Sequence, residues 1–235
     1  MDPLAKLKDA HNAGRIPSKV YDLVEKRFPI IVEGIDRIEK ASGIQYPAAY
    51  VEPSIVITSA DPQSYQFGIL FARTIPVTHN DIFQVVIEIS APLVAYGLKG
   101  TIHAILAHEF LHFLELVRKI SRMEVISDEV SGNMFEGVYA DQGRLFEPRA
   151  VFDDRTLQRH IIKRFPAGFH DYKLEDKVIK LWLDRKLPKT NIALDSNTVK
   201  ISAESLSKIK IDPRFIQKLG ELEVKSKKMS KKRLY

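Results

Sequence analysis

The stretch TIHAILAHEFLHFLELVR, residues 101–118, decides the fold that we predict for this chain. Its apolar residues recur with helical spacing and cover most of the helix surface, a pattern typical of a helix buried on nearly every side. His108, Glu109 and His112 interrupt this apolar surface. Burying two imidazoles and a carboxylate is unfavourable unless they have partners, so the sequence predicts a compensated polar site at the centre of the molecule.

Helical geometry brings the two histidines of this stretch to the same face. His108 and His112 leave the helix about 40° apart around its axis and one turn apart along it. Two imidazole nitrogens at this spacing can bind one zinc ion at about 2.0–2.1 Å each. Glu109 lies about 100° round the helix from His108, where it can contact a water on the metal rather than the metal. The plainer alternative is a set of satisfied polar groups in an ordinary helix, although a chance match to this motif has odds of about one in a hundred.

Helices and then strands are predicted before this stretch. Residues 12–43 show helical spacing, with a break or kink at Pro29 and an end at Gly43. Three short runs rich in β-branched and aromatic residues predict about three strands of one sheet, at residues 55–58, 67–71 and 83–89. A further helix is predicted after the central one, from Ser127 to about Tyr139.

The C-terminal third of the chain is predicted to be helical. Amphipathic or short helical segments are expected at residues 156–165, 174–187, 203–209 and 213–222. We therefore predict an α+β core at residues 1–150, followed by a helical C-terminal subdomain at residues 151–223. Residues 224–235, VKSKKMSKKRLY, contain six Lys and Arg residues and no acid, which equals the whole net charge of +6. They are predicted to form a disordered basic tail, with weak binding to nucleic acid or an anionic surface as the lesser alternative.

Composition excludes several classes of protein. The 235 residues include no cysteine, which rules out disulfide frameworks, thiolate metal ligands and a cysteine nucleophile. No window approaches the roughly 20 apolar residues of a membrane span. The first residues, MDPLAKLKDAHNAG, are polar and lack the apolar segment of a signal peptide, so a cytoplasmic protein is expected.

The motif HEFLH at residues 108–112, together with the order helix, strands, motif helix and second helix over about residues 17–140, resembles the zincin metallopeptidases. The C-terminal third lies outside this resemblance. It implies a zincin-like core made of N-terminal helices, a small mixed sheet, an active-site helix and a glutamate helix. It also implies that His108 and His112 bind Zn²⁺ and that Glu109 is the general base of peptide hydrolysis.

The third zinc ligand distinguishes the zincin classes. The metzincin extension requires glycine and histidine where this chain has Glu115 and Arg118, and the deformylase site requires a cysteine. A ferritin-like di-iron site requires a second glutamate-two-any-histidine pair, which the sequence lacks. The gluzincin arrangement remains, with a glutamate on the next helix as the ligand.

Glu129 is the glutamate that best fits the gluzincin arrangement. It lies 17 residues after His112, slightly closer than usual, and Asn133 replaces the usual aspartate four residues later. The alternative for Glu129 is a favourable interaction with the helix N-terminus behind Ser127. Glu136 is the main rival ligand and Asp128 a more distant one; if the gluzincin reading fails, His160 or His170 becomes the ligand to test.

Two further features complete the functional hypothesis. Zincins of this type stabilise the oxyanion with a tyrosine or histidine beyond the glutamate helix, and His170 or Tyr172 matches that description. The strand at residues 83–90 is either an edge strand that pairs with peptide substrate or a central strand. The sequence thus predicts a zinc metallopeptidase acting on peptides or proteins. The rival hypothesis is a zincin-shaped, non-catalytic binding or scaffold module that uses the C-terminal subdomain and basic tail.

Overall fold

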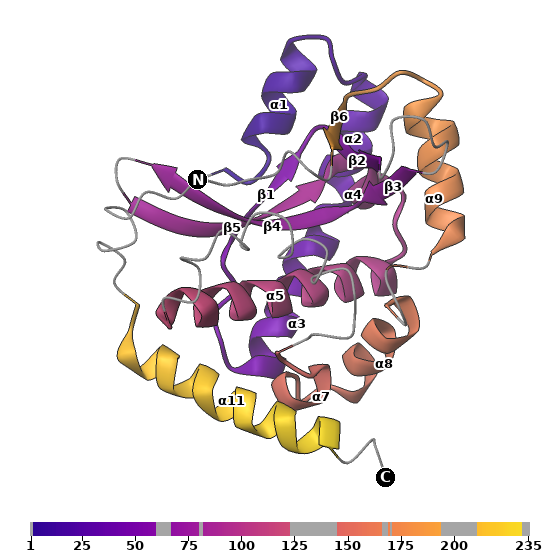
Figure 1. Ribbon diagram of the computed structural model, residues 1–235. Helices are drawn as coiled ribbons and strands as arrows, with labels where there is room; N and C mark the ends of the chain where they lie inside the picture. Colours follow the sequence, from indigo (N-terminus) through magenta and orange to yellow (C-terminus); the bar gives the residue numbers. More distant parts are fainter. Residues whose placement is uncertain are drawn as a thin grey trace.

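The computed structural model describes residues 2–59, 67–79, 82–122, 145–165, 169, 171–193 and 211–231. Two small sheets and a set of helices make up this part of the chain, so the predicted α+β class is confirmed (Figure 1). Glu129, Glu136, Asp128, His170 and the predicted helix at residues 127–139 lie outside the described residues.

Three helices form the N-terminal part. They are α1 (Ala5–Asn12), α2 (Ser18–Arg27) and α3 (Pro29–Ser42). The break predicted at Pro29 is confirmed, because α2 ends two residues earlier and the proline occupies the first turn of α3, where no backbone N–H is needed. Gly43 ends α3 in the left-handed region, with a φ of 61°. Helix α1 was not predicted.

The strands form two three-stranded sheets instead of the single sheet predicted. In the first, β1 (Ala48–Glu52) pairs parallel with β5 (Ile82–Ser90), which pairs antiparallel with β4 (Ala72–His79). In the second, β2 (Ile55–Ser59) lies between antiparallel β3 (Phe67–Leu70) and parallel β6 (Lys189–Ala193). Strand β5 is central, so the edge-strand reading of residues 83–90 is wrong; β4 is the outer strand beside it among the described strands.

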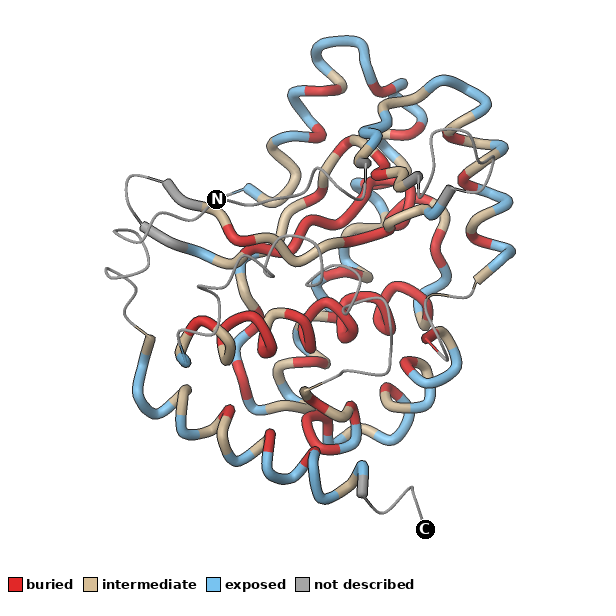
Figure 2. Tube along the Cα trace, in the orientation of Figure 1, coloured by how far each residue is buried: buried red, intermediate tan, exposed pale blue. Residues whose placement is uncertain are grey.

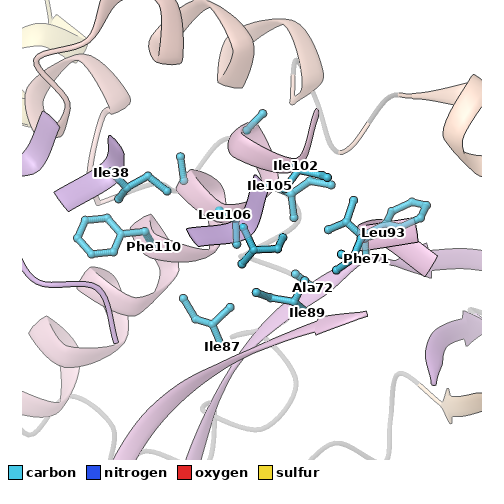
Figure 3. Packing of buried hydrophobic residues seen from close by; sticks show 14 of the residues in the cluster. Ile38, Phe71, Ala72, Ile87, Ile89, Leu93, Ile102, Ile105, Leu106 and Phe110 are labelled. Atoms are coloured by element: carbon cyan, nitrogen blue, oxygen red, sulfur yellow. The ribbon is translucent and has the colours of Figure 1, made fainter. Parts of the chain in front are cut away.

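Helix α5 (Lys99–Ser121) is the centre of the molecule. It follows the short helix α4 (Ala91–Tyr96), and every residue from Thr101 to His112 is buried, as predicted from its apolar surface (Figure 2). Figure 1 shows α5 between the first sheet and the C-terminal helices. Ile87 and Ile89 of β5 belong to the same hydrophobic cluster as Ile105 and Leu106 of α5 (Figure 3).

The C-terminal part contains several helices and one strand. The helices are α7 (Pro148–Val151), α8 (Arg155–Arg164), α9 (Tyr172–Val178), a π-helical turn at Ile179–Leu183 and α11 (Pro213–Lys231). Residues on both sides of the predicted boundary at 150 contribute to one hydrophobic cluster, which includes the fully buried Trp182. The segment predicted as a helical C-terminal subdomain, residues 151–223, also contains a strand that was not predicted, because β6 completes the second sheet. Of the helices in the described ranges, none is long and apolar enough to cross a membrane.

The predicted disordered tail is wrong for residues 224–231, which continue α11. Leu219, Glu223 and Ser226 are buried along one face of this helix. The Glu147 N–H donates to the Ser226 hydroxyl at 3.0 Å, and the Lys225 ammonium donates to the Ala150 carbonyl at 2.9 Å. Although residues 224–231 are mostly basic, one face of this part of α11 packs on α7.

Deleting residues 224–235 should therefore destabilise the protein. The truncation leaves the Glu147 N–H without its acceptor and removes the last turns of α11, for an expected loss of about 2 kcal/mol. For a chain of this size that loss corresponds to a fall in melting temperature of about 4–8 °C. Deleting only residues 232–235 is the matched control, since the contacts of Ser226 and Lys225 remain. An unchanged melting temperature in the longer truncation would contradict the packing of α11.

Candidate metal centre

The two motif histidines face each other inside α5. Their Nε2 atoms are 2.8 Å apart, and their ring planes are almost perpendicular, with an interplanar angle of 89°. The side chains are buried, with exposed fractions of 6% for His108 and 8% for His112. The geometry confirms the expectation that both rings leave the same face of the helix.

An aromatic wall fixes the plane of the first imidazole. The His108 ring stacks on Phe165, with ring centroids 3.8 Å apart and planes 5° from parallel. The ring centroid of Phe169 lies 5.5 Å from that of Phe165 and 5.2 Å from that of Phe71. These aromatic rings therefore connect the end of α8 with the residue just before β4. Apolar rings on this side keep water away from the pair.

The Glu109 carboxylate is held by the outer strand β4. The hydroxyl of Thr74 lies 2.9 Å from Glu109 Oε2 and 2.9 Å from the Glu109 carbonyl oxygen, so its single proton serves one of them at a time. Glu109 is 7% exposed, and burial raises the pKa of its carboxyl against the opposing effects of His112 and Thr74. A raised pKa makes a carboxylate a stronger proton acceptor.

Glu115 lies on the other side of the second histidine. Its Oε2 is 3.7 Å from His112 Nδ1, and its Oε1 accepts the backbone N–H of Leu145. The side chain is 8% exposed. Burial tends to raise the pKa of the Glu115 carboxyl, but the His112 ring and the Leu145 N–H outweigh it, and the pKa is lowered.

Helix α8, which carries Phe165 at its end, is anchored to α3 by an ion pair. Arg37 donates to both carboxylate oxygens of Asp154 at 2.7 and 3.0 Å, and Asp154 also accepts the Thr156 and Leu157 N–H groups as the N-cap of α8. His103 is buried beside this pair, with Nε2 3.2 Å from the Ile30 carbonyl and Nδ1 3.4 Å from Arg37. These contacts make His103 a packing residue of the helix interface.

Replacing Asp154 with asparagine should show how much the Arg37–Asp154 ion pair stabilises the protein at each pH. The Arg37 guanidinium, with the N–H groups of Leu157 and Thr156, lowers the pKa of Asp154 from 3.8 to about 2. Because the folded pKa lies below the unfolded one, the stabilisation is complete above about pH 4–5 and is lost as the pH falls through about 2. Asparagine keeps the cap but not the charge, so we expect a loss of about 1–2 kcal/mol at pH 7, after solvent screening of this partly exposed pair.

Denaturant unfolding of both proteins at several pH values measures this difference. The free energies of unfolding should converge as the pH approaches 2. A difference that is constant from pH 7 to pH 2.5 would show that the charge of Asp154 contributes nothing.

The chemistry of the histidine pair fits a zinc ion. Two ligands at about 2.0–2.1 Å in a tetrahedral site lie about 3.3 Å apart, so the pair at 2.8 Å needs only a small opening. Among the residues that the structure describes, no three His, Cys, Asp or Glu side chains gather closely enough to hold a metal. A zinc ion held by this pair would need a further ligand, and the predicted Glu129 and Glu136 both lie outside the described residues.

The structure places two other predicted residues near the start of α5. Tyr172 is 70% exposed and begins α9, whose capping residue Asp171 accepts a hydrogen bond from the Thr101 hydroxyl at 2.8 Å. The His160 ring of α8 packs over Gly100. Gly100 and Thr101 precede His108 by about two helical turns, so His160 does not lie at the histidine pair. The oxyanion role of Tyr172 stays a prediction.

Comparison with known proteins adds no relative: no protein-family model matches the chain, and neither the curated proteins nor the solved structures contain a match.

Three residues of the site were not assigned a role from the sequence. Thr74 and Phe165 reach the motif only through long-range packing, and no local pattern marks them. Glu115 carries a signal, because a residue three positions after His112 lies on the same helix face. Glu115 also stands where the metzincin pattern requires glycine, which excludes that class but assigns the residue no role.

Proposed function

We propose that this protein is a zinc-dependent metallopeptidase of gluzincin type with a zincin-like core. The observation that carries the proposal is the convergence of the His108 and His112 Nε2 atoms, 2.8 Å apart, on a buried helix beside a buried Glu109. A buried pair of imidazoles and an adjacent carboxylate are costly to keep unless they bind something. Zinc is the metal best suited to imidazole and carboxylate ligands in a tetrahedral site with one open position.

Each residue around the histidine pair would have a separate role in peptide hydrolysis. A zinc ion bound there would supply Lewis-acid activation, lowering the pKa of a water molecule towards 7. Glu109 would accept the proton of that water during attack on the scissile carbonyl and pass it to the leaving amine. Thr74 would hold the carboxylate in position, and the Phe165 wall would exclude competing water.

The position of β4 supports a substrate bound in extended form. It is the outer strand of its sheet among the described strands, and it carries Thr74, which contacts Glu109. A peptide paired with this edge would pass beside the proposed base, read mainly through its main chain. His170 or Tyr172 as oxyanion donor and a cytoplasmic location belong to this proposal as predictions from the sequence.

Metal analysis and a hydrolysis assay test the proposal together. Protein purified without chelator should contain about one zinc per chain, and its cleavage of a mixed peptide library should stop on chelation and return with zinc. Bound zinc without hydrolysis would favour the binding or scaffold module instead. No zinc at all, with His108→Ala and His112→Ala indistinguishable from the parent, would reject the metal site.

A further inference from the structure

A buried ring nitrogen of the second histidine lacks a hydrogen bond. His112 Nδ1 is inaccessible to solvent and has no hydrogen-bond partner among the described residues. The nearest carboxylate oxygen given by the structure is Glu115 Oε2, at 3.7 Å. Both residues are buried, with an exposed fraction of 8% each, so water is not freely available to either. A buried donor or acceptor without a partner is destabilising, so a hydrogen-bond partner for His112 Nδ1 is expected in the functional state of the site.

The orientation of the ring decides what Glu115 can do. Nε2 and Nδ1 lie on different edges of an imidazole, and the Nε2 of His112 faces His108. Glu115 is on the Nδ1 side, away from the point where the two Nε2 atoms converge. With the ring in this orientation, Glu115 does not share a metal with the histidine pair.

Metal binding would change the protonation of this ring in a defined way. A metal takes the lone pair of Nε2, so a neutral His112 must then carry its proton on Nδ1. That N–H needs an acceptor in a buried place. One oxygen of Glu115 is already anchored by the Leu145 N–H, which leaves Oε2 to serve as that acceptor after a shift of about 1 Å.

We propose that Glu115 is a positioning residue of the metal site, which accepts the His112 Nδ1–H and so fixes the tautomer and the plane of that ligand. This inference rests on the proposed function, because it assigns a role to Glu115 only if the histidine pair binds zinc. Its charge also offsets part of the charge of a buried divalent ion. Outer partners of this kind typically contribute 10–100-fold to metal affinity.

Zinc affinity of Glu115→Gln, measured by competition with a chelator, tests the inference. Glutamine keeps the volume and an acceptor for the Leu145 N–H, but it lacks the charge that strengthens the bond to Nδ1–H. We expect zinc affinity to fall about tenfold or more, with the melting temperature of the metal-free protein unchanged. Glu88→Gln is the matched control, because Glu88 is equally buried but pairs with Arg73 and Tyr50. It should leave zinc affinity at the parent value.

A second measurement needs no variant, in case Glu115→Gln fails to fold. In zinc-loaded parent protein labelled with ¹⁵N-histidine, NMR should show His112 with a hydrogen-bonded Nδ1–H. A proton on Nε2 instead would overturn the inference. So would zinc affinity within twofold of the parent in Glu115→Gln, although the proposed peptidase function would then stand. If the parent binds no zinc, the proposed function and this role of Glu115 both fail.

Discussion

Replacing Glu109 with glutamine is expected to lower peptide hydrolysis by about 10²–10⁴-fold while bound zinc stays at the parent level. Glutamine matches the size of the side chain and can still contact Thr74, but it cannot accept the proton of the attacking water. Because the loss concerns a step of the reaction rather than substrate binding, it should appear in kcat more than in KM. Steady-state kinetics and zinc analysis of the same preparations measure both quantities.

The control for this experiment is Glu52→Gln, which changes a partly exposed glutamate that pairs with Lys6, outside the site. Its activity should equal that of the parent. Hydrolysis by Glu109→Gln within tenfold of the parent, with zinc bound, would remove Glu109 from the role of general base.

Replacing Glu129 with alanine is expected to lower zinc affinity by more than about 100-fold. Residues that only hydrogen-bond to a metal ligand typically contribute about 10–100-fold to metal affinity. The loss of an anionic ligand itself should lower zinc affinity by more than that. It would also leave a buried divalent ion with less neutralising charge. Glu129 is preferred from the sequence because Asn133, Met134 and Phe135 follow it at the offsets that the gluzincin resemblance implies.

Glu136→Ala is the internal comparison, and its zinc affinity should stay close to that of the parent. If only this variant loses zinc, the third ligand is Glu136, two helical turns further along a predicted helix. If neither variant loses zinc, the gluzincin assignment is wrong. His170 then becomes the next residue to replace, since His160 packs over Gly100 instead.

Local sequence patterns predicted helix α5 and the placement of its two histidines, but not the residues from other elements that contact them. The apolar run of α5 and the four-residue spacing of its histidines depend only on helix geometry, and both appear in the structure as expected. The hydroxyl of Thr74, the ring of Phe165 and the Leu145 N–H reach the site from separate elements. Such contacts depend on the packing of the whole fold, and spacing along the chain does not encode them.

The C-terminal helix was predicted at residues 213–222, but its continuation to Lys231 was not, for a different reason. Its buried face contains Glu223 and Ser226 beside Leu219, so a search for apolar residues at helical spacing finds too few of them. The buried Glu223 carboxylate pairs with Arg118 of α5, with Arg122 directly after α5, and with Lys227 of its own helix. A charged residue can thus belong to a packed face when its partners come from another helix.

The pairing of β6 with β2 has a consequence for synthesis on the ribosome. The hydrogen bond between Ser54 and Thr190 links residues 136 positions apart, and the two strands around it are parallel. At about 5–20 residues per second, about 7–27 seconds pass between the appearance of β2 and that of its partner. One edge of β2 stays without that partner in the nascent chain throughout this delay, a state in which strands are prone to aggregate.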